Sequence, residues 1–400
     1  MKAPLDGLSP EKQTILDTVE RHRDLILRIN RDLYCHPELS GEETRSCRFL
    51  GRLLEDQNFR VRYQLADLPT AFLATRGKGG NGPKIAFLAE YDALPDIGHG
   101  CGHNLIAAAA IGAALAVADM LEIHPGEIQV IGTPAEETFG GKVILAEAGL
   151  FAGLDAVMMI HPAGENRVYT TSLAARTYQV DFLGKASHAV AHPEKGINAL
   201  DALVELYRAA GIMEREDPGG TRLPGVILVG GKRANLVPDR AVGEFSLRTP
   251  TMEGLRVLEK RFQSAVGEIA QNTGCQFRLE ANHLPYSEMR TNRMMADSFK
   301  ENLRILGETT EDGPRNRMGS LDMGNVSQLV PAIHPFIAIC RPSLASHTRE
   351  FAQATQMPEG EKGLLLAARA LALTAADVLV SADLRRRIDE EFRRPGGKTK

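Results

Sequence analysis

Between residues 61 and 160, short apolar runs alternate with helical segments, and this alternation limits the possible folds more than any other feature. The runs at 84–89, 127–132 and 156–160 have the length and composition of buried strands, whereas 102–121 and 140–149 are typical of helices. Strands that alternate with helices predict a mostly parallel sheet, because each connecting helix packs back onto the sheet. We therefore expect an α/β core with helices on both faces of the sheet.

The pattern changes near Thr171. The next part of the chain predicts four strands and two helices in the order β-α-β-β-α-β, which is typical of a ferredoxin-like α+β unit. After residue 284 the helix–strand pattern resumes, and a length of 400 residues is enough for two domains. We interpret 1–171 and 285–400 as one domain, and 172–284 as a second domain inserted into it.

Two helical segments carry further expectations. Apolar positions recur at helical spacing from Ser9 to Leu33, which predicts one helix that ends before Pro37. The most apolar stretch, 105–118, is rich in alanine and is shorter than the ~20 residues that span a bilayer. We expect a buried helix packed closely against the sheet, and no membrane partner.

Composition excludes several classes of function. Lys and Arg number 47 and Asp and Glu 51, a net charge of −4, so a polyanion-binding surface is not expected to be the main function and nucleic acid is not an expected partner. The first residues have no apolar core and do not predict a secretory signal. The five cysteines are scattered and odd in number, which favours the reducing cytoplasm over a disulfide framework.

Polar, metal-capable residues follow three of the predicted strands. The strand 84–89 is followed by the segment 90–104, EYDALPDIGHGCGHN; the strand 127–132 by Glu136 and Glu137; and the strand 156–160 by His161. In open α/β sheets, ligands bind beyond the carboxyl ends of the strands. We therefore expect these side chains to converge at one edge of the sheet.

The residue types indicate metal chemistry. Thiolate, imidazole and carboxylate together suit Zn²⁺, with Mn²⁺, Ni²⁺ or Co²⁺ as competitors. Cys101 and His103 are two residues apart, so both can face one ion. Glu136 and Glu137 are adjacent, so one can bind the ion while the other acts as a general base. Asp92 is a candidate partner for the second nitrogen of His103.

Each of these residues also has a structural interpretation. A single buried Cys, a histidine at a strand end or a solvated pair of glutamates is common without any ion. A second alternative makes Cys101 a nucleophile with a histidine as its base. The metal interpretation is favoured because His103 is too close in sequence to orient Cys101 and because a cysteine hydrolase leaves the carboxylates without a role.

Six motifs across the chain carry a resemblance to a known family. They are AEYDALPDIGHGCGHN, GTPAEE, GKASHAVAHPEKGINALDA, ANLVPDRAVGEFSLR, GSLDMGNVS and SHTREF. In this order they resemble the zinc-dependent aminoacylases, dipeptidases and carboxypeptidases of peptidase family M20. The branch they resemble contains p-aminobenzoyl-glutamate hydrolase, the Xaa-Arg dipeptidases and the auxin-conjugate amidohydrolases.

The resemblance implies a role for individual residues of the first domain. It implies a site for two divalent metal ions in which Cys101 is a bridging thiolate. The other implied ligands are His103, Glu137, His161 and His347. Glu136 matches the general base and Asp92 the carboxylate beside the metal-binding turn. His347 is recruited by the resemblance alone, since its position in the sequence gives no such signal.

The resemblance also implies that the inserted domain is a lid and a dimerisation domain. His188 resembles a histidine that reaches the active site of the neighbouring subunit and stabilises the oxyanion. Asn235 and Arg248 match a pair that contacts the substrate, with Arg248 able to anchor a carboxylate through two hydrogen bonds. From the residues alone, these three would be interpreted as loop or surface positions.

Three positions depart from the family pattern. Leu321 occurs where Thr is expected, Gly100 where Ala is common, and Asn104 where relatives often have Asp. None of them is a proposed ligand, and Leu321 is expected to affect the choice of substrate.

The expected function is hydrolysis of the amide bond of a small N-acyl or aminoacyl amino acid by a metal-activated water. The substrate classes left open are dipeptides, N-acyl amino acids and aryl-amides such as p-aminobenzoyl-glutamate, acted on by a cytoplasmic homodimer. Two alternatives are an inactive metal-containing binding protein and the cysteine hydrolase that would use Cys101.

Overall fold

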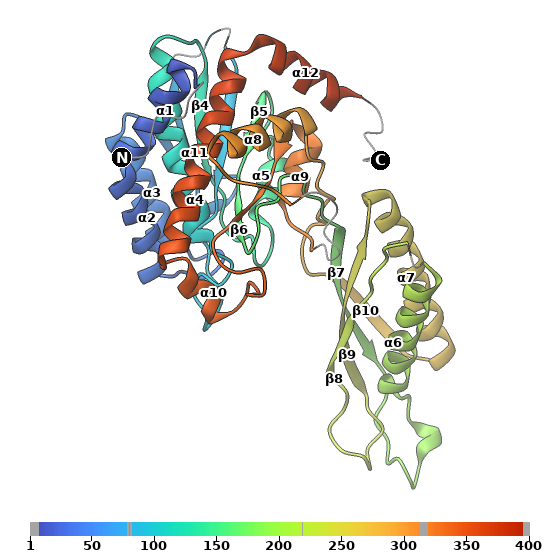
Figure 1. Cartoon of the computed structure of the whole chain (residues 1–400). Helices are drawn as coiled ribbons and strands as arrows, with labels where there is room; N and C mark the ends of the chain where they lie inside the picture. Colours follow the sequence, from blue (N-terminus) through green and yellow to red (C-terminus); the bar gives the residue numbers. More distant parts are fainter. Residues whose placement is uncertain (1–7, 78–79, 81, 218, 312–318, 395–400) are drawn as a thin grey trace. The chain divides into compact units, whose positions relative to one another are not determined.

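The computed structural model describes residues 8–77, 80, 82–217, 219–311 and 319–394, which divide into two compact units (Figure 1). Unit 1 comprises the described residues of Met1–Thr171, Met289–Arg317 and Asn325–Lys400. Unit 2 comprises those of Ser172–Glu288 and Met318–Gly324. Unit 2 is thus an insertion between two parts of unit 1.

The second boundary lies at Glu288 rather than at residue 284, where the strand pattern of the sequence predicts it. Tyr286 exchanges two backbone hydrogen bonds of 2.9 Å with Ala175, which prolongs the pairing at one end of the unit 2 sheet. The carboxylate of Glu288 accepts a hydrogen bond of 2.9 Å from the backbone N–H of Met252. The chain therefore stays with unit 2 for four residues longer than the strand pattern indicates.

Unit 1 contains a six-stranded sheet with the strand order β1-β2-β4-β3-β5-β11. Strands β4, β3, β5 and β11 pair in parallel, and β1 and β2 extend the sheet with antiparallel pairs. The predicted mostly parallel sheet is confirmed. The strands are β1 (Arg60–Leu65), β2 (Leu68–Gly77), β3 (Lys84–Ala89), β4 (Glu127–Gly132), β5 (Ala156–Met158) and β11 (Ala332–Ile333).

Helix α4 (His103–Ala118) is buried along its whole length, as its alanine-rich sequence predicts. It packs against β3, β4, α2 and α11 (Pro358–Val380). By length and hydropathy, the segments His103–Glu122 and Pro358–Val380 could each span a membrane, but 89% and 83% of these apolar windows are buried inside the protein. The two segments thus have the burial of core helices.

The predicted single helix near the N-terminus is wrong in one respect. The chain forms α1 (Pro10–Arg21) and α2 (Arg23–Cys35), and His22 lies between them with φ −90° and ψ 5°. The other helices of unit 1 are shorter and flank the sheet. They include α3 (Thr44–Asp56), α5 (Gly141–Glu147), α8 (Arg293–Ile305), α10 (Arg349–Ala354) and α12 (Ala382–Arg393), while α9 (Met323–Leu329) begins at the unit boundary.

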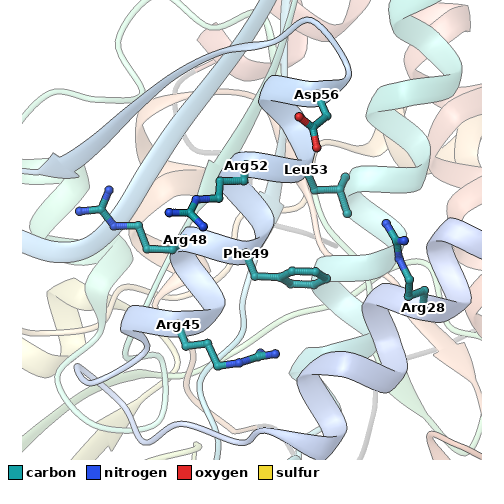
Figure 2. Close-up of a pocket in the computed structure, with 7 residues that line it drawn as sticks. All are labelled: Arg28, Arg45, Arg48, Phe49, Arg52, Leu53 and Asp56. Carbon is teal, nitrogen blue, oxygen red and sulfur yellow. The ribbon is translucent and has the colours of Figure 1, made fainter.

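A groove between α2 and α3 is lined mainly by arginines (Figure 2). Phe49 and Leu53 of α3 form its apolar part, and its volume is about 310 Å³. Arg45 is held by Asp32 through two hydrogen bonds of 2.7 and 2.9 Å. Asp56 is the only acidic residue among the lining residues, so the groove has no set of metal ligands.

Unit 2 has a four-stranded antiparallel sheet in the order β10-β7-β9-β8. Helices α6 and α7 pack on this sheet around a buried core that includes Phe182, Phe245 and Phe262. The predicted ferredoxin-like order is confirmed. The elements are β7 (Ala174–Leu183), α6 (Ala199–Glu216), β8 (Gly225–Val229), β9 (Arg240–Thr249), α7 (Met252–Thr273) and β10 (Gln276–Ala281).

Candidate metal centre and active site

The candidate site lies at the carboxyl ends of β4, β3 and β5, which are neighbours in the sheet. Because these strands are parallel, the loops that follow them meet at one edge. Gly102 begins α4 with φ +79°, and a Cβ atom there would lie 2.4 Å from Cγ of Pro162. Glycine is therefore required at this turn, which places Cys101 and His103 on either side of it.

The metal-capable side chains named in the sequence analysis come together in unit 1. Sγ of Cys101 lies 3.5 Å from Nε2 of His161 and 3.4 Å from Nε2 of His347. Oε1 of Glu137 lies 3.8 Å from Nε2 of His103 and 3.6 Å from Nε2 of His347. Cys101 thus belongs to two three-residue groups, one with His103 and His161 and one with Glu137 and His347.

Several buried polar atoms at this site have no hydrogen-bond partner among the described residues. They include Nε2 of His103, Oε1 of Glu137 and Oε2 of Glu90. Buried polar atoms are nearly always paired, and groups left unpaired need an explanation. A divalent cation satisfies a carboxylate oxygen and an imidazole nitrogen that face each other, so the donor set fits a metal.

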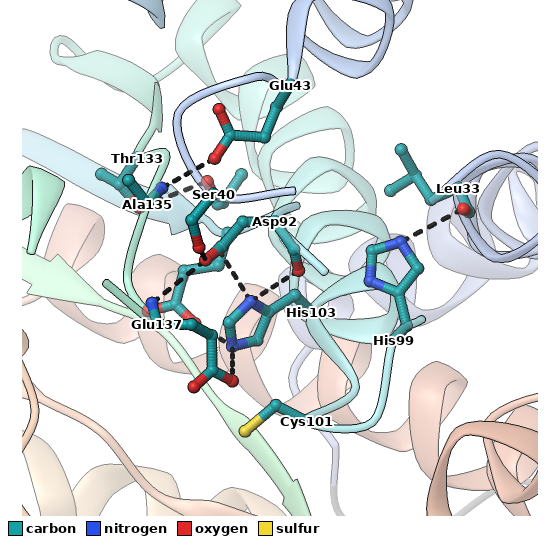
Figure 3. A network of polar contacts seen from close by, with 12 residues as sticks. Leu33, Ser40, Glu43, Asp92, His99, Cys101, His103, Thr133, Ala135 and Glu137 are labelled. Carbon is teal, nitrogen blue, oxygen red and sulfur yellow. Dashed lines mark hydrogen bonds and ion pairs between the residues drawn. The ribbon is translucent and has the colours of Figure 1, made fainter. Parts of the chain in front are cut away.

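Asp92 fixes the orientation of His103 (Figure 3). Its Oδ1 lies 2.8 Å from Nδ1 of His103, and its Oδ2 accepts hydrogen bonds from Ser40 and from the backbone N–H of Glu137. Burial raises the pKa of Asp92, but His103 and these donors hold it well below its usual value. The carboxylate therefore stays ionised and leaves Nε2 of His103 directed at the cluster.

His161 is oriented in the same way by a backbone carbonyl. Its Nδ1 lies 2.8 Å from the oxygen of Pro162, which leaves Nε2 toward Cys101. Burial lowers the pKa of His161 to about 3, so the imidazole is neutral, the form that binds metals. A cavity of about 610 Å³ begins at His161 and is bordered by Phe336, Phe351 and the loop 342–346.

The two adjacent glutamates follow a residue with an unusual backbone. Ala135 has φ +59°, a conformation that alanine rarely adopts. Glu136 lies in one metal-capable group with His103 and Glu137, so both glutamates face the cluster. The side chain of Glu137 is 10% exposed.

The alternative of a catalytic thiol is disfavoured. Burial raises the pKa of the Cys101 thiol. A nucleophilic cysteine needs a lowered pKa, because the thiolate is the reactive form.

Sequence reasoning missed a buried ion pair beside the cluster. Nζ of Lys142 lies 2.5 Å from Oε1 of Glu90, and both side chains are almost fully buried. Oε2 of Glu90 lies 3.3 Å from Nε2 of His103. The available signal was a lysine inside the otherwise apolar helix 141–147, together with a glutamate directly after a buried strand.

The remaining predicted residues belong to unit 2. His188 and Asn235 are exposed and lie on paired loops, since the N–H of Ala189 donates to the oxygen of Asn235 at 3.1 Å. Arg248, on β9, is partly buried, and its Nε donates to Oγ of Ser246 at 3.2 Å. Burial lowers the pKa of Arg248.

Two of the departures from the family pattern have local explanations. A Cβ atom at Gly100 would lie 2.6 Å from Cγ2 of Ile97, so Ala there would require Ile97 to shift. Asn104 is fully buried, and its amide donates to Oδ1 of Asn30 and Oγ1 of Thr355. An ionised Asp could not donate these hydrogen bonds. Nothing in the structure explains Leu321.

The α/β unit with a metal-capable cluster at its strand ends and an inserted ferredoxin-like unit defines the class of two-domain metallohydrolases. The chain belongs to peptidase family M20/M25/M40, whose sequence profile matches residues 86–370. It is a hydrolase that acts on amide bonds.

Characterised proteins are similar to the chain over nearly its whole length. The Xaa-Arg dipeptidase of Mus musculus is 36% identical, with 96% of this chain and 92% of that protein covered. A p-aminobenzoyl-glutamate hydrolase of Escherichia coli is 26% identical in one of its subunits, with 94% of this chain and 93% of that protein covered.

Solved structures show the same fold. A putative aminohydrolase from methicillin-resistant Staphylococcus aureus superposes with a TM-score of 0.77 at 20% identity, covering 92% of this chain and 100% of that one. The YXEP protein of Bacillus subtilis, a dinuclear metal binding peptidase from the M20 family, superposes with a TM-score of 0.68 at 21% identity, covering 90% and 99%.

Proposed function

We propose that this protein is a dinuclear metallohydrolase that cleaves the amide bond of a dipeptide or an N-acyl amino acid. The unpaired buried atoms of His103 and Glu137 beside Cys101 are the observation that carries the proposal. Cys101 would be shared between two ions, and the other ligands would be His103, Glu137, His161 and His347. Zn²⁺ suits this donor set best, with Mn²⁺, Co²⁺ and Ni²⁺ as alternatives.

Glu136 is the proposed general base. Bound metal ions would supply Lewis acidity, lowering the pKa of a water molecule and polarising the scissile carbonyl. Glu136 would accept the proton of that water and then deliver it to the leaving amine. Its place in one group with His103 and Glu137 supports this role. Asp92 would keep His103 in the tautomer that directs Nε2 at the site.

Three residues of unit 2 have proposed roles in substrate binding. Arg248 would pair with the carboxylate of the substrate, and Asn235 would hydrogen-bond to the same end of it. His188 would donate to the developing oxyanion of the neighbouring subunit. The support for these roles is the family membership and the matching motifs.

A dipeptide that ends in arginine is the first substrate to test, since the Xaa-Arg dipeptidases of mouse and human are each 36% identical to this chain. The test measures amine release from a panel of dipeptides with basic, acidic and apolar ends, N-acetyl amino acids and p-aminobenzoyl-glutamate. Each substrate is assayed with Zn²⁺ or Mn²⁺ and after chelation. Cleavage that disappears on chelation and returns with metal supports the proposal. Metal binding without any cleavage would favour the alternative of an inactive binding protein.

The general base is tested by Glu136→Gln. We expect it to retain bound metal and to lose turnover by about 100-fold or more, the usual contribution of general base catalysis. Glu147→Gln is the matched control, because Glu147 is exposed on α5. Metal content is measured by atomic absorption beside kcat. A Glu136→Gln enzyme with most of its activity would show that the base is another residue.

We also propose a homodimer formed through unit 2. Four consecutive apolar side chains on the edge strand β8 are between 40% and 53% exposed: Val226, Ile227, Leu228 and Val229. An exposed apolar edge strand is a ready surface for pairing with a second copy. Leu228→Lys is expected to shift the sedimentation coefficient toward that of a monomer, whereas Val257→Lys on α7 should not. A wild-type monomer at all concentrations would contradict this proposal.

The cytoplasm is the proposed location, without a nucleic acid or membrane partner. All five cysteines are unpaired, which is usual for proteins of a reducing compartment. Fractionation of cells that express a tagged chain tests this location.

A further inference from the structure

A buried carboxylate outside the predicted site touches the turn that carries both functional glutamates. Glu43 is 0% exposed. Its Oε1 accepts hydrogen bonds from the backbone N–H groups of Ala135 at 2.9 Å and of Gly41 at 2.8 Å, and its Oε2 accepts one from the hydroxyl of Thr70 at 2.8 Å (Figure 3). It therefore connects the start of α3 to the residue directly before Glu136.

The position of Glu43 in the sequence would suggest a simpler role. It is the N-cap residue of α3, yet its side chain makes no capping hydrogen bond. The cap is supplied by Glu38, whose carboxylate accepts from the N–H groups of Arg45 at 2.9 Å and Ser46 at 2.7 Å. The stability of the helix start therefore does not explain why a carboxylate is buried at position 43, where desolvation is costly.

The backbone of Ala135 supplies the reason for this contact. A left-handed conformation costs a non-glycine residue about 1–2 kcal/mol, and it persists only where the surroundings hold it. Glu43 binds the N–H of Ala135, and the N–H of Gly140 donates to its carbonyl oxygen at 2.9 Å. The peptide is thus held from both sides, and the directions of Glu136 and Glu137 follow from it.

We propose that Glu43 is a positioning residue for the reaction, holding the turn at Ala135 so that Glu136 and Glu137 face the cluster together. The inference rests on the proposed function, in which Glu136 is the base and Glu137 a metal ligand. Glu43 itself touches neither substrate nor metal. Its loss should therefore reduce both turnover and metal affinity.

The test compares Glu43→Met, which keeps the volume but has no oxygen, with Glu43→Gln, whose amide oxygen can still accept from Ala135. For Glu43→Met we expect kcat to fall about 10- to 100-fold and metal to bind about 10-fold more weakly, the usual effect of losing an outer-shell partner. KM should change by less than about three-fold, because no substrate contact is lost. Glu43→Gln should recover most of both losses.

Glu38→Gln is the matched control, because it weakens the cap of α3 without touching Ala135. It should lower the melting temperature and leave kcat and metal affinity unchanged. Metal affinity is measured by competition with a chromophoric chelator, which does not depend on activity. If Glu43→Met fails to fold, Thr70→Val removes one contact of the carboxylate and should give a smaller loss in the same direction.

Three outcomes would overturn the inference. They are wild-type kcat and metal affinity in Glu43→Met, equal damage in Glu43→Gln and Glu43→Met, and the same kinetic loss in Glu38→Gln. Failure of the proposed function is distinguishable, because wild type would then not cleave the panel, or Glu136→Gln would stay active.

Discussion

At the scale of single residues, the site depends on unusual backbone conformations beside its functional side chains. Ala135 precedes the two glutamates with φ +59°, and His347 itself has φ +63°. The N–H of His347 donates to the oxygen of Gly100 at 2.8 Å, which ties its loop to the turn of Cys101. Such strain persists where surrounding contacts over-determine it, as hydrogen bonds do at both positions.

The buried pair of Lys142 and Glu90 gives the first prediction at this scale. Lys142→Met leaves an uncompensated carboxylate in the core and should lower the free energy of unfolding by about 3–5 kcal/mol. The double variant with Glu90→Gln should lose less than the sum of the two single variants. Urea denaturation of the metal-free proteins measures both effects, and additive losses would contradict the coupling.

The same pair predicts a pH dependence. Burial raises the pKa of Glu90, but Lys142 and His103 bring it below its usual value in the folded protein. A carboxyl group with a lowered folded pKa stabilises the protein above its unfolded pKa of about 4.3, and this stabilisation is lost as the pH falls through the folded value. The difference between wild type and Lys142→Met should therefore be largest near neutral pH and shrink below about pH 4.

Sequence reasoning found those site residues that follow buried strands. Cys101, His103, Glu137 and His161 all come after strands of a parallel sheet, whose order brings their ends together. His347 lies on a loop far along the chain, and only the family resemblance pointed to it. Glu43 could not be predicted, because its partner is a backbone N–H in another loop and the positive φ of Ala135 leaves no mark in the sequence.

At the scale of elements, helix α4 shows why the sheet can hold a site at its edge. Small side chains bring the helix close to the sheet and to α2 and α11. A Cβ atom at Gly112 would lie 2.6 Å from Cδ1 of Ile26 and 3.3 Å from Cβ of Ala368. Close packing of this kind fixes the first turn of α4, where His103 lies.

Two glycine substitutions test this packing. Gly112→Leu should lower the free energy of unfolding by about 1–3 kcal/mol through overpacking. Gly267→Ala in α7 has nothing within 4 Å of the new Cβ and should stabilise its helix by about 0.5–1 kcal/mol. Denaturant unfolding measures both, and equal effects of the two substitutions would contradict the packing described here.

Element boundaries were predictable where a pattern ended sharply and not where tertiary contacts decide. The strand at 127–132 and the start of the helix at Met252 have the expected bounds. The division of the N-terminal helix at His22 was missed, because the helical periodicity continues through it. The short strand β11 was missed as well, since two residues carry no periodicity.

At the scale of the whole molecule, the proposed metal ligands all belong to unit 1, whereas the proposed substrate anchors belong to unit 2. Metal should therefore stabilise one unit selectively. A ligand at 100 times its dissociation constant adds about 2.7 kcal/mol to the unit that binds it.

Hydrogen exchange with and without a chelator measures this selectivity. Chelation should speed exchange in 90–104 and 133–137, and leave the amides of α6 and α7 unchanged. The core of unit 2 around Phe245 and Phe262 is the internal control. Equal acceleration in both units would show that metal binding stabilises the chain as one cooperative body.

The place where unit 2 is inserted has an evolutionary consequence. On unit 1, the chain leaves at Thr171 and returns at Met289, and close to these points the hydroxyl of Thr291 donates to the carbonyl oxygen of Thr170 at 2.6 Å. The two ends of the interruption are thus already neighbours within unit 1. A hydrolytic core with such a closed seam can gain, lose or exchange its inserted module without refolding, so substrate choice and assembly can diversify while the chemistry stays the same.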